Sequence, residues 1–140
     1  MFPPNNGFPR ILEGLLLAGL AVSAGCGGAA SLTEIQRIHS GVFDIVLLSP
    51  DGVLHQKDPF TIEFRSAPGG NLVNVGTLRA SANMPMPDMP MFGSIDVRPG
   101  DAPGRYTAKG DLEMAGGWRI VLEWDGPTGR ETLSFLGTIQ

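Results

Sequence analysis

The stretch Gly117-Trp-Arg-Ile-Val-Leu-Glu-Trp-Asp-Gly126, written GWRIVLEWDG, decides the fold class of this chain. Large apolar residues occupy every second position from Trp118 to Trp124, and two of the three positions between them are charged. Such alternation is typical of a half-buried β-strand, because successive side chains point to opposite faces of a sheet. The following DGPTG, residues 125–129, has the composition of a turn. The stretch therefore predicts a strand whose tryptophans face the core.

The same period of two recurs along the chain, interrupted by turn-forming Pro, Gly, Asp and Asn. The other predicted strands are Gly41–Ser49, Phe60–Phe64, Leu72–Ala82 with a bulge at Gly76, Gly93–Val97, Arg105–Leu112 and a last strand through Leu133 and Phe135. Seven short strands without a convincing helix predict an all-β fold, an immunoglobulin-like antiparallel β-sandwich. Tyr106, shortly after a Pro-Gly turn, is placed like the tyrosine of a tyrosine corner.

The N-terminus has the layout of a secretory signal, with Arg10 ahead of an apolar run and small residues up to Cys26. Ser23-Ala-Gly-Cys26 resembles a bacterial lipobox, which predicts lipidation of Cys26; an ordinary cleaved signal and a retained anchor are the alternatives. Each alternative exports the rest of the chain, so we expect a lipid-anchored protein of the bacterial periplasm or cell envelope. The predicted boundaries are a lipoprotein signal peptide at 1–25, a tether at 26–40 and the β-sandwich domain at 41–140.

Composition excludes several classes of function. The 140 residues contain one cysteine and carry a net charge of −4. An exported part without further cysteines has neither a disulfide nor a thiolate metal site, and an acidic chain with scattered basic residues argues against a nucleic-acid partner. The only histidines, His39 and His55, lack the context of a nucleophilic triad. We therefore expect no enzymatic activity.

A cluster of methionines stands out in ANMPMPDMPMFG, residues 82–93. Four of the five non-initiator methionines, Met84, Met86, Met89 and Met91, fall within eight residues and alternate with prolines. Thioether sulfur is a soft, neutral ligand that favours Cu(I). The prolines predict an exposed connection or an edge rather than a central strand, and a turn at Pro87-Asp88 would bring Met86 and Met89 together.

Three interpretations of the cluster are open: flexible packing at one end of the sandwich, a site for Cu(I) or Ag(I), and a methionine-rich surface that binds a protein. His39, His55 and Met114 are additional candidate ligands, if the fold brings any of them beside the cluster.

The ordered combination of the methionine cluster, Pro103-Gly-Arg-Tyr106 and the strand that contains GWRIVLEWDG resembles the YtkA-like domain, a family related to the FixH-like group. The resemblance covers roughly residues 41–135. It implies a small exported immunoglobulin-like sandwich associated with copper handling, with the four cluster methionines as ligands. The implied partner is a membrane-bound metal transporter or an oxidase-assembly protein, to which the domain passes the ion. The alternative is a non-metal accessory module that docks onto a membrane complex through its methionine-rich loop.

Overall fold

The computed structural model describes residues 31–140, and this part of the chain is all β. Its strands are β1 (Thr33–Ser40), β2 (Phe43–Ser49), β3 (Pro59–Ser66), β4 (Leu78–Met84), β5 (Met91–Pro99), β6 (Arg105–Asp111), β7 (Gly116–Gly126) and β8 (Gly129–Ile139). The predicted all-β fold is confirmed, with eight strands in place of seven. The predicted signal peptide and Cys26 lie outside the described residues. Residues 31–140 include no helix with the length and apolarity needed to cross a membrane.

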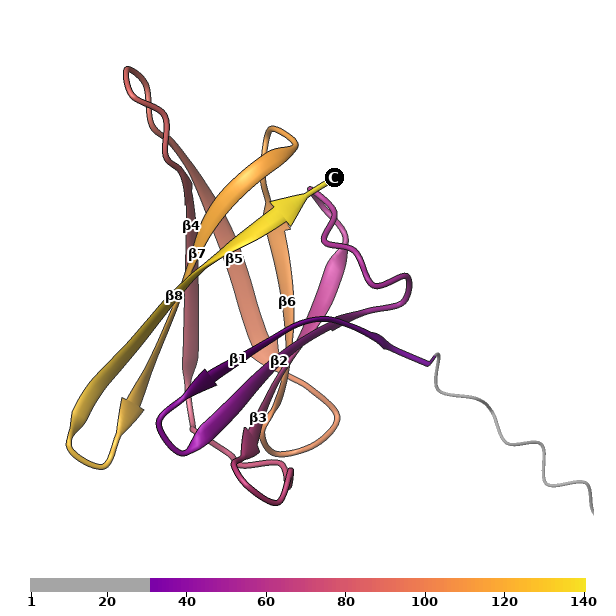
Figure 1. Ribbon diagram of the computed structural model, residues 1–140, viewed down its shortest axis with the longest axis vertical. Coiled ribbons are helices and arrows are strands. Elements are labelled where there is room, and N and C mark those ends of the chain that lie inside the picture. The colour runs from indigo at the N-terminus through magenta and orange to yellow at the C-terminus, as the bar shows by residue number, and fades with distance from the viewer. Residues whose placement is uncertain (1–30) are drawn as a thin grey trace, which may run out of the picture.

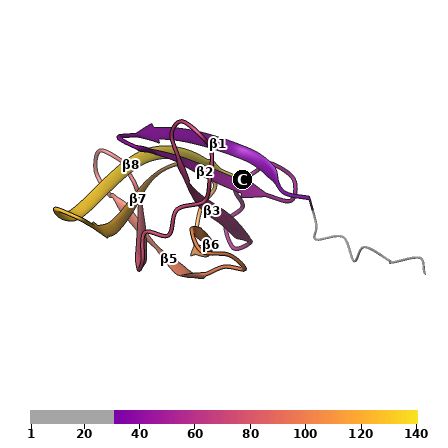
Figure 2. The ribbon, with the colours of Figure 1, turned by 90° about the horizontal axis from the view of Figure 1, so that it is seen from below.

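The eight strands form one antiparallel sheet in the order β1-β2-β3-β6-β5-β4-β7-β8. The sheet curls so that β1, β2 and β8 lie over β5 and β6 (Figure 2). The connection between β2 and β3 meets the end of β8, where Leu54 pairs with Ile139. There Gln140 donates a backbone hydrogen bond to Leu54 and accepts one from Gln56. These contacts nearly close the sheet, and the curled sheet forms the two layers of the predicted sandwich.

The core lies between the two layers and follows the predicted alternation. Trp118 and Trp124 are 0% and 2% exposed, which confirms that the tryptophans of β7 face inward. Gly93 of β5 faces Trp118, and a Cβ there would collide with the side chain of Leu112. Glycine at 93 therefore leaves room for the side chains of Leu112 and Trp118.

The two ends of the sheet differ in composition. At the end where β2 begins and β3 ends, the ring of Phe64 meets those of Phe43, Tyr106 and Trp124 edge to face, with centroids 5.9, 6.0 and 5.0 Å away. We call this the aromatic end. The other end carries the β4–β5 hairpin, which projects beyond the rest of the sheet (Figure 1), and the methionines. We call it the methionine end.

The buried carboxylate of Glu63 binds two arginines that reach two connections at the aromatic end. Glu63 is 3% exposed. Its two oxygens accept hydrogen bonds from Arg65 Nε at 2.7 Å and Arg105 Nε at 2.9 Å. Arg65 also donates to the carbonyl of Gly70 in the β3–β4 connection, and Arg105 donates to Asp101 in the β5–β6 connection. A buried charge needs such partners, and here they reach across the sheet to both connections.

Strand β1 corrects the predicted tether. Thr33–Ser40 lies within the segment 26–40, yet it pairs with β2 along its whole length. The pairing register shifts between Glu34 and Gln36, and the residues that pack on the core are Ile35 and Ile38. A bulge thus gives the apolar residues a spacing of three, which hides the period of a strand. The sheet begins at Thr33, before the predicted domain start at Gly41.

The predicted strand Leu72–Ala82 is also corrected, because β4 begins only at Leu78. Asn74 Oδ1 accepts the N–H of Gly76 at 2.9 Å, and Gly76 has a φ of +79°. An Asx turn and a left-handed residue end the extended conformation there. Tyr106 does not make a tyrosine corner: its O–H donates to the carbonyl of Gly76 at 2.7 Å, thirty residues upstream rather than a few. Tyr106 therefore fastens the β3–β4 connection to β6.

Candidate functional site

The methionine cluster forms the hairpin between β4 and β5. Met84 and Met91 are directly paired across the two strands, so their side chains share one face of the sheet. Opposite residues of an antiparallel pair have Cβ atoms about 4.5–5.5 Å apart. The ladder ends at this pair, and the next residues outward, Pro85 and Pro90, have no N–H to donate. The prolines therefore end the pairing and leave a short tip.

The structure revises where the four methionines stand. Met84 and Met91 belong to strands inside the sheet, whereas the sequence predicted an exposed connection or edge for all four. Met86 and Met89 flank the bend at residues 87–88, as predicted for a reversal of the chain at that point. Exposure rises outward from 7% at Met84, through a half-buried Met91, to 36% at Met86 and 72% at Met89. The methionines of the hairpin therefore range from buried at its base to exposed at its tip.

The sequence carries a signal for this pairing that the initial interpretation missed. Residues 84–91, MPMPDMPM, read the same in both directions except for Pro87 and Asp88 at the centre. A hairpin folded at that centre sets methionine opposite methionine and proline opposite proline. The observed pairing of Met84 with Met91 has this register. Continued outward, the register places Met86 opposite Met89.

Met114 is the fifth methionine of this end. It lies in the β6–β7 connection and is 46% exposed. Its carbonyl accepts a hydrogen bond of 2.9 Å from Trp118 Nε1, so a buried indole fixes the backbone at this point. Two residues further on, a Cβ at Gly116 would lie 3.1 Å from the terminal methyl group of Met84. The connection that carries Met114 therefore borders the base of the hairpin.

The two histidines lie at different ends of the sheet. His39 is near the end of β1, at the aromatic end, with Nδ1 2.9 Å from Asp44 Oδ1. His55 is at the methionine end, in the connection that meets the end of β8, with Nε2 2.6 Å from Asp51 Oδ2. That hydrogen bond raises the pKa of His55 and lowers the pKa of Asp51. The fold thus separates His39 from the methionines, and Asp51 already binds Nε2 of His55.

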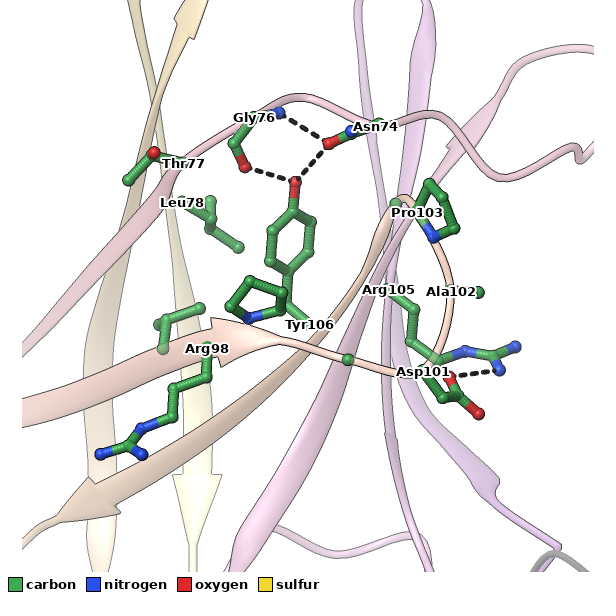
Figure 3. A pocket seen from close by; sticks show the side chains of 14 residues that line it. Asn74, Gly76, Thr77, Leu78, Arg98, Asp101, Ala102, Pro103, Arg105 and Tyr106 are labelled. Carbon is green, nitrogen blue, oxygen red and sulfur yellow. Dashed lines mark hydrogen bonds and ion pairs between the residues drawn. The ribbon is translucent and has the colours of Figure 1, made fainter.

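Other features of the described residues do not form a competing site. Between residues 31 and 140 no three His, Cys, Asp or Glu side chains gather in a way that could hold a metal ion. A hollow of about 540 Å³ lies at the aromatic end, between the β3–β4 and β5–β6 connections (Figure 3). The hydroxyl of Tyr106 is bonded to Gly76, and burial raises the pKa of Tyr106. The charged side chains of the lining are also paired, Arg98 with Asp96 and Arg105 with Asp101. The hairpin therefore remains the candidate site.

Comparison with known proteins gives one match. A family model described as YtkA-like matches residues 39–123. The match begins at the end of β1, includes the methionine hairpin and stops within β7. Most of β1 and all of β8 therefore fall outside it. These are the first and last strands in the order of the sheet. No curated protein and no solved structure matches the chain significantly.

Proposed function

The chain belongs to the YtkA-like family, and we propose that it is an exported accessory protein that holds Cu(I), or Ag(I), on its methionine hairpin and passes the ion to a membrane-bound partner. The proposed partner is a metal transporter or an oxidase-assembly protein. The proposed location is the bacterial periplasm or cell envelope, with a lipid anchor at Cys26. The protein would carry the ion and catalyse no reaction.

One observation supports the proposal most strongly: the register that sets Met84 opposite Met91. A two-coordinate or three-coordinate thioether site requires sulfurs that can converge on one ion, and the side chains of direct cross-strand partners share a face of the sheet and lie close enough for this. The donor set also fits the ion. Thioethers are soft and uncharged, and the described residues offer no cluster of harder ligands that would favour another metal.

The gradient of exposure suits an ion in transit. Met89 is 72% exposed at the tip and Met84 is 7% exposed at the base. A partner's ligands can reach an ion at the tip without opening the fold. Because thioethers bind without losing a proton, uptake and release need no protonation step at the hairpin.

Anaerobic titration with Cu(I), in competition with a chromogenic chelator, tests the proposal. Two double variants test the base and the tip of the hairpin separately. The base variant combines Met84→Leu with Met91→Leu, and the tip variant combines Met86→Leu with Met89→Leu. We expect each to weaken binding by more than about tenfold, or about 1.4 kcal/mol. Leucine keeps the bulk of methionine, so the change in unfolding free energy should stay below about 1.5 kcal/mol. Titration with Ag(I) repeats the test without a redox-active ion.

The matched control is Met114→Leu, which removes a thioether beside the hairpin rather than on it. If Met114→Leu changes the Cu(I) affinity little, the ion binds on the hairpin alone. If the variant lowers the affinity strongly, Met114 is also a ligand. If the variant with leucine at all four hairpin positions binds Cu(I) as tightly as the natural protein, the carrier function is wrong.

A second function, a non-metal accessory module, is favoured by the exposure of Met89 at the tip and of Phe92 in β5, which is 77% exposed. Large apolar side chains at such exposure are common where a protein binds a partner. If the protein is such a module, the leucine variants would still bind the partner protein, because leucine preserves apolar contact. Binding of the partner without binding of metal therefore distinguishes the module from the carrier.

A further inference from the structure

Exposed apolar side chains are concentrated at the methionine end. Seven large hydrophobic residues are exposed within residues 31–140, and five of them lie at this end: Met86, Met89, Phe92, Met114 and Leu136. Phe92 and Leu136 are 77% and 64% exposed, although neither belongs to the hairpin tip. Isolated surface hydrophobics are ordinary, but a concentration of them commonly marks an interaction site.

Phe92 and Leu136 are joined by the pairing of four strands. Phe92 of β5 pairs with Asn83 of β4, Asn83 pairs with Arg119 of β7, and Arg119 pairs with Leu136 of β8. Neighbouring strands are about 4.8 Å apart, so three steps span about 14 Å. All four residues face outward, because their neighbours Met84 and Trp118 face the core. We call these four residues the outer row.

The outer row carries one charge, and that charge is free. Arg119 is exposed and makes no ion pair with any residue from 31 to 140. Arg79, further along β4 on the same face, lies 3.9 Å from Glu123 and 3.6 Å from Asp125. The positions between the two arginines carry no charge: Ser81, Ser94, Val121 and Ser134. The acidic side chains of this face lie outside the outer row: Glu123 and Asp125 are next to Arg79, and Asp111 of β6 pairs with Ser94 and lies 3.8 Å from Lys57. Within the row, the one charged group is the guanidinium of Arg119.

We propose that the outer row is a docking surface for a partner protein that presents a carboxylate to Arg119 and apolar depressions to Phe92 and Leu136. Aromatic residues and arginine are the side chains most enriched where binding energy concentrates in protein interfaces. The surface adjoins the hairpin, since Phe92 directly follows Met91. The inference does not rest on the proposed function, because none of the four residues is a thioether and docking requires no metal.

The charge pattern favours such a protein over two other occupants. A membrane surface would gain only about 1 kcal/mol from one basic residue, and Asp88 at the adjoining tip would oppose contact with anionic lipid. A second copy of the chain, arranged symmetrically, would bring the row against itself. The two Arg119 side chains would then approach each other without an acidic residue in the row to neutralise them.

Site-specific photo-cross-linking of the full-length protein in its own cells tests the inference. A benzophenone amino acid replaces Leu136 in one variant and Thr132, on the outward face of β8 away from the row, in the control. We expect a protein adduct at 136 and none at 132. The captured protein, identified by mass spectrometry and purified, is then titrated with the natural protein, Arg119→Glu, Phe92→Ser and the control Arg130→Glu. Arg130 is an exposed arginine of the same strand at the aromatic end.

The proposal predicts that Arg119→Glu and Phe92→Ser weaken binding by at least about tenfold and that Arg130→Glu changes it less than about twofold. Replacing the opposing carboxylate of the partner with lysine should restore binding to Arg119→Glu. The proposal is overturned by an adduct with twice the mass of the chain, by adducts with lipid alone, by equal adducts at 136 and 132, by no adduct at all, or by a captured protein that binds all variants equally.

Discussion

The aromatic end and the methionine end are closed by different means. At the aromatic end, four rings interlock, Tyr106 bonds to the β3–β4 connection, and Glu63 holds two arginines. At the methionine end, the hairpin projects from the sheet and its prolines end the backbone pairing. The aromatic end thus buries its interacting rings, whereas the methionine end combines a buried base at Met84 and Trp118 with exposed side chains at Met86, Met89 and Phe92.

We infer that the residues that stabilise the fold and the residues that bind a ligand or partner lie at opposite ends of the strands. Rings and buried hydrogen bonds at the aromatic end bring distant segments together, since Tyr106 contacts residues thirty positions upstream. Beyond the pair Met84–Met91 the strand pairing ends, and Met86 and Met89 are exposed, so these two side chains are free to serve a ligand or a partner. Variants at the aromatic end should therefore change the free energy of unfolding, and variants at the hairpin tip should change binding.

The largest effect should come from Phe64→Ala at the centre of the aromatic end. Phe64 is fully buried and meets three other rings edge to face. The cavity and the lost ring contacts should lower the free energy of unfolding by about 3–5 kcal/mol in chemical denaturation. Met89→Ala, at the exposed tip, should change it by less than about 0.5 kcal/mol. Comparable losses for the two variants would refute the division between the ends.

A smaller effect is expected for Tyr106→Phe, which removes only the hydroxyl. The carbonyl of Gly76 would lose its hydrogen bond in a half-buried site, at a cost of about 1–2 kcal/mol. Hydrogen exchange at amides of the β3–β4 connection should accelerate, while exchange in β7 and β8 stays as in the natural protein. If the whole sheet exchanged faster by the same factor, Tyr106 would stabilise the fold generally and would not act as a local fastener.

The fold class was predictable because its signal is local. The alternation from Trp118 to Trp124 gives the inward face of a strand, and the structure buries both tryptophans. Strand β1 was missed because a bulge spaces Ile35 and Ile38 three residues apart. The late start of β4 was missed because the Asx turn at Asn74 interrupts a stretch that still looks extended.

The candidate site was predictable in composition and only partly in geometry. The sequence identified the four methionines and a reversal at Pro87-Asp88, and it selected Met86 and Met89 as the pair. The pair that the strand ladder fixes is Met84 with Met91. Burial of Met84 depends on Gly116, thirty-two residues away in the chain, which borders its methyl group. Contacts of that kind follow from the order of strands in the sheet, which no local pattern encodes.

The smallest effect should be a pH dependence at the methionine end, where Asp51 holds His55. Their hydrogen bond raises the pKa of His55, so its stabilisation is complete below the usual histidine value of about 6.5 and is lost as pH rises through the raised pKa. The same bond lowers the pKa of Asp51. The stabilisation that comes from ionised Asp51 is therefore lost only as pH falls through that lowered pKa. His55→Gln should therefore lower the Tm more at about pH 6 than at about pH 8. Cu(I) affinity should stay constant over that range, because thioethers do not titrate, and a loss of affinity in His55→Gln would make this histidine part of the metal site.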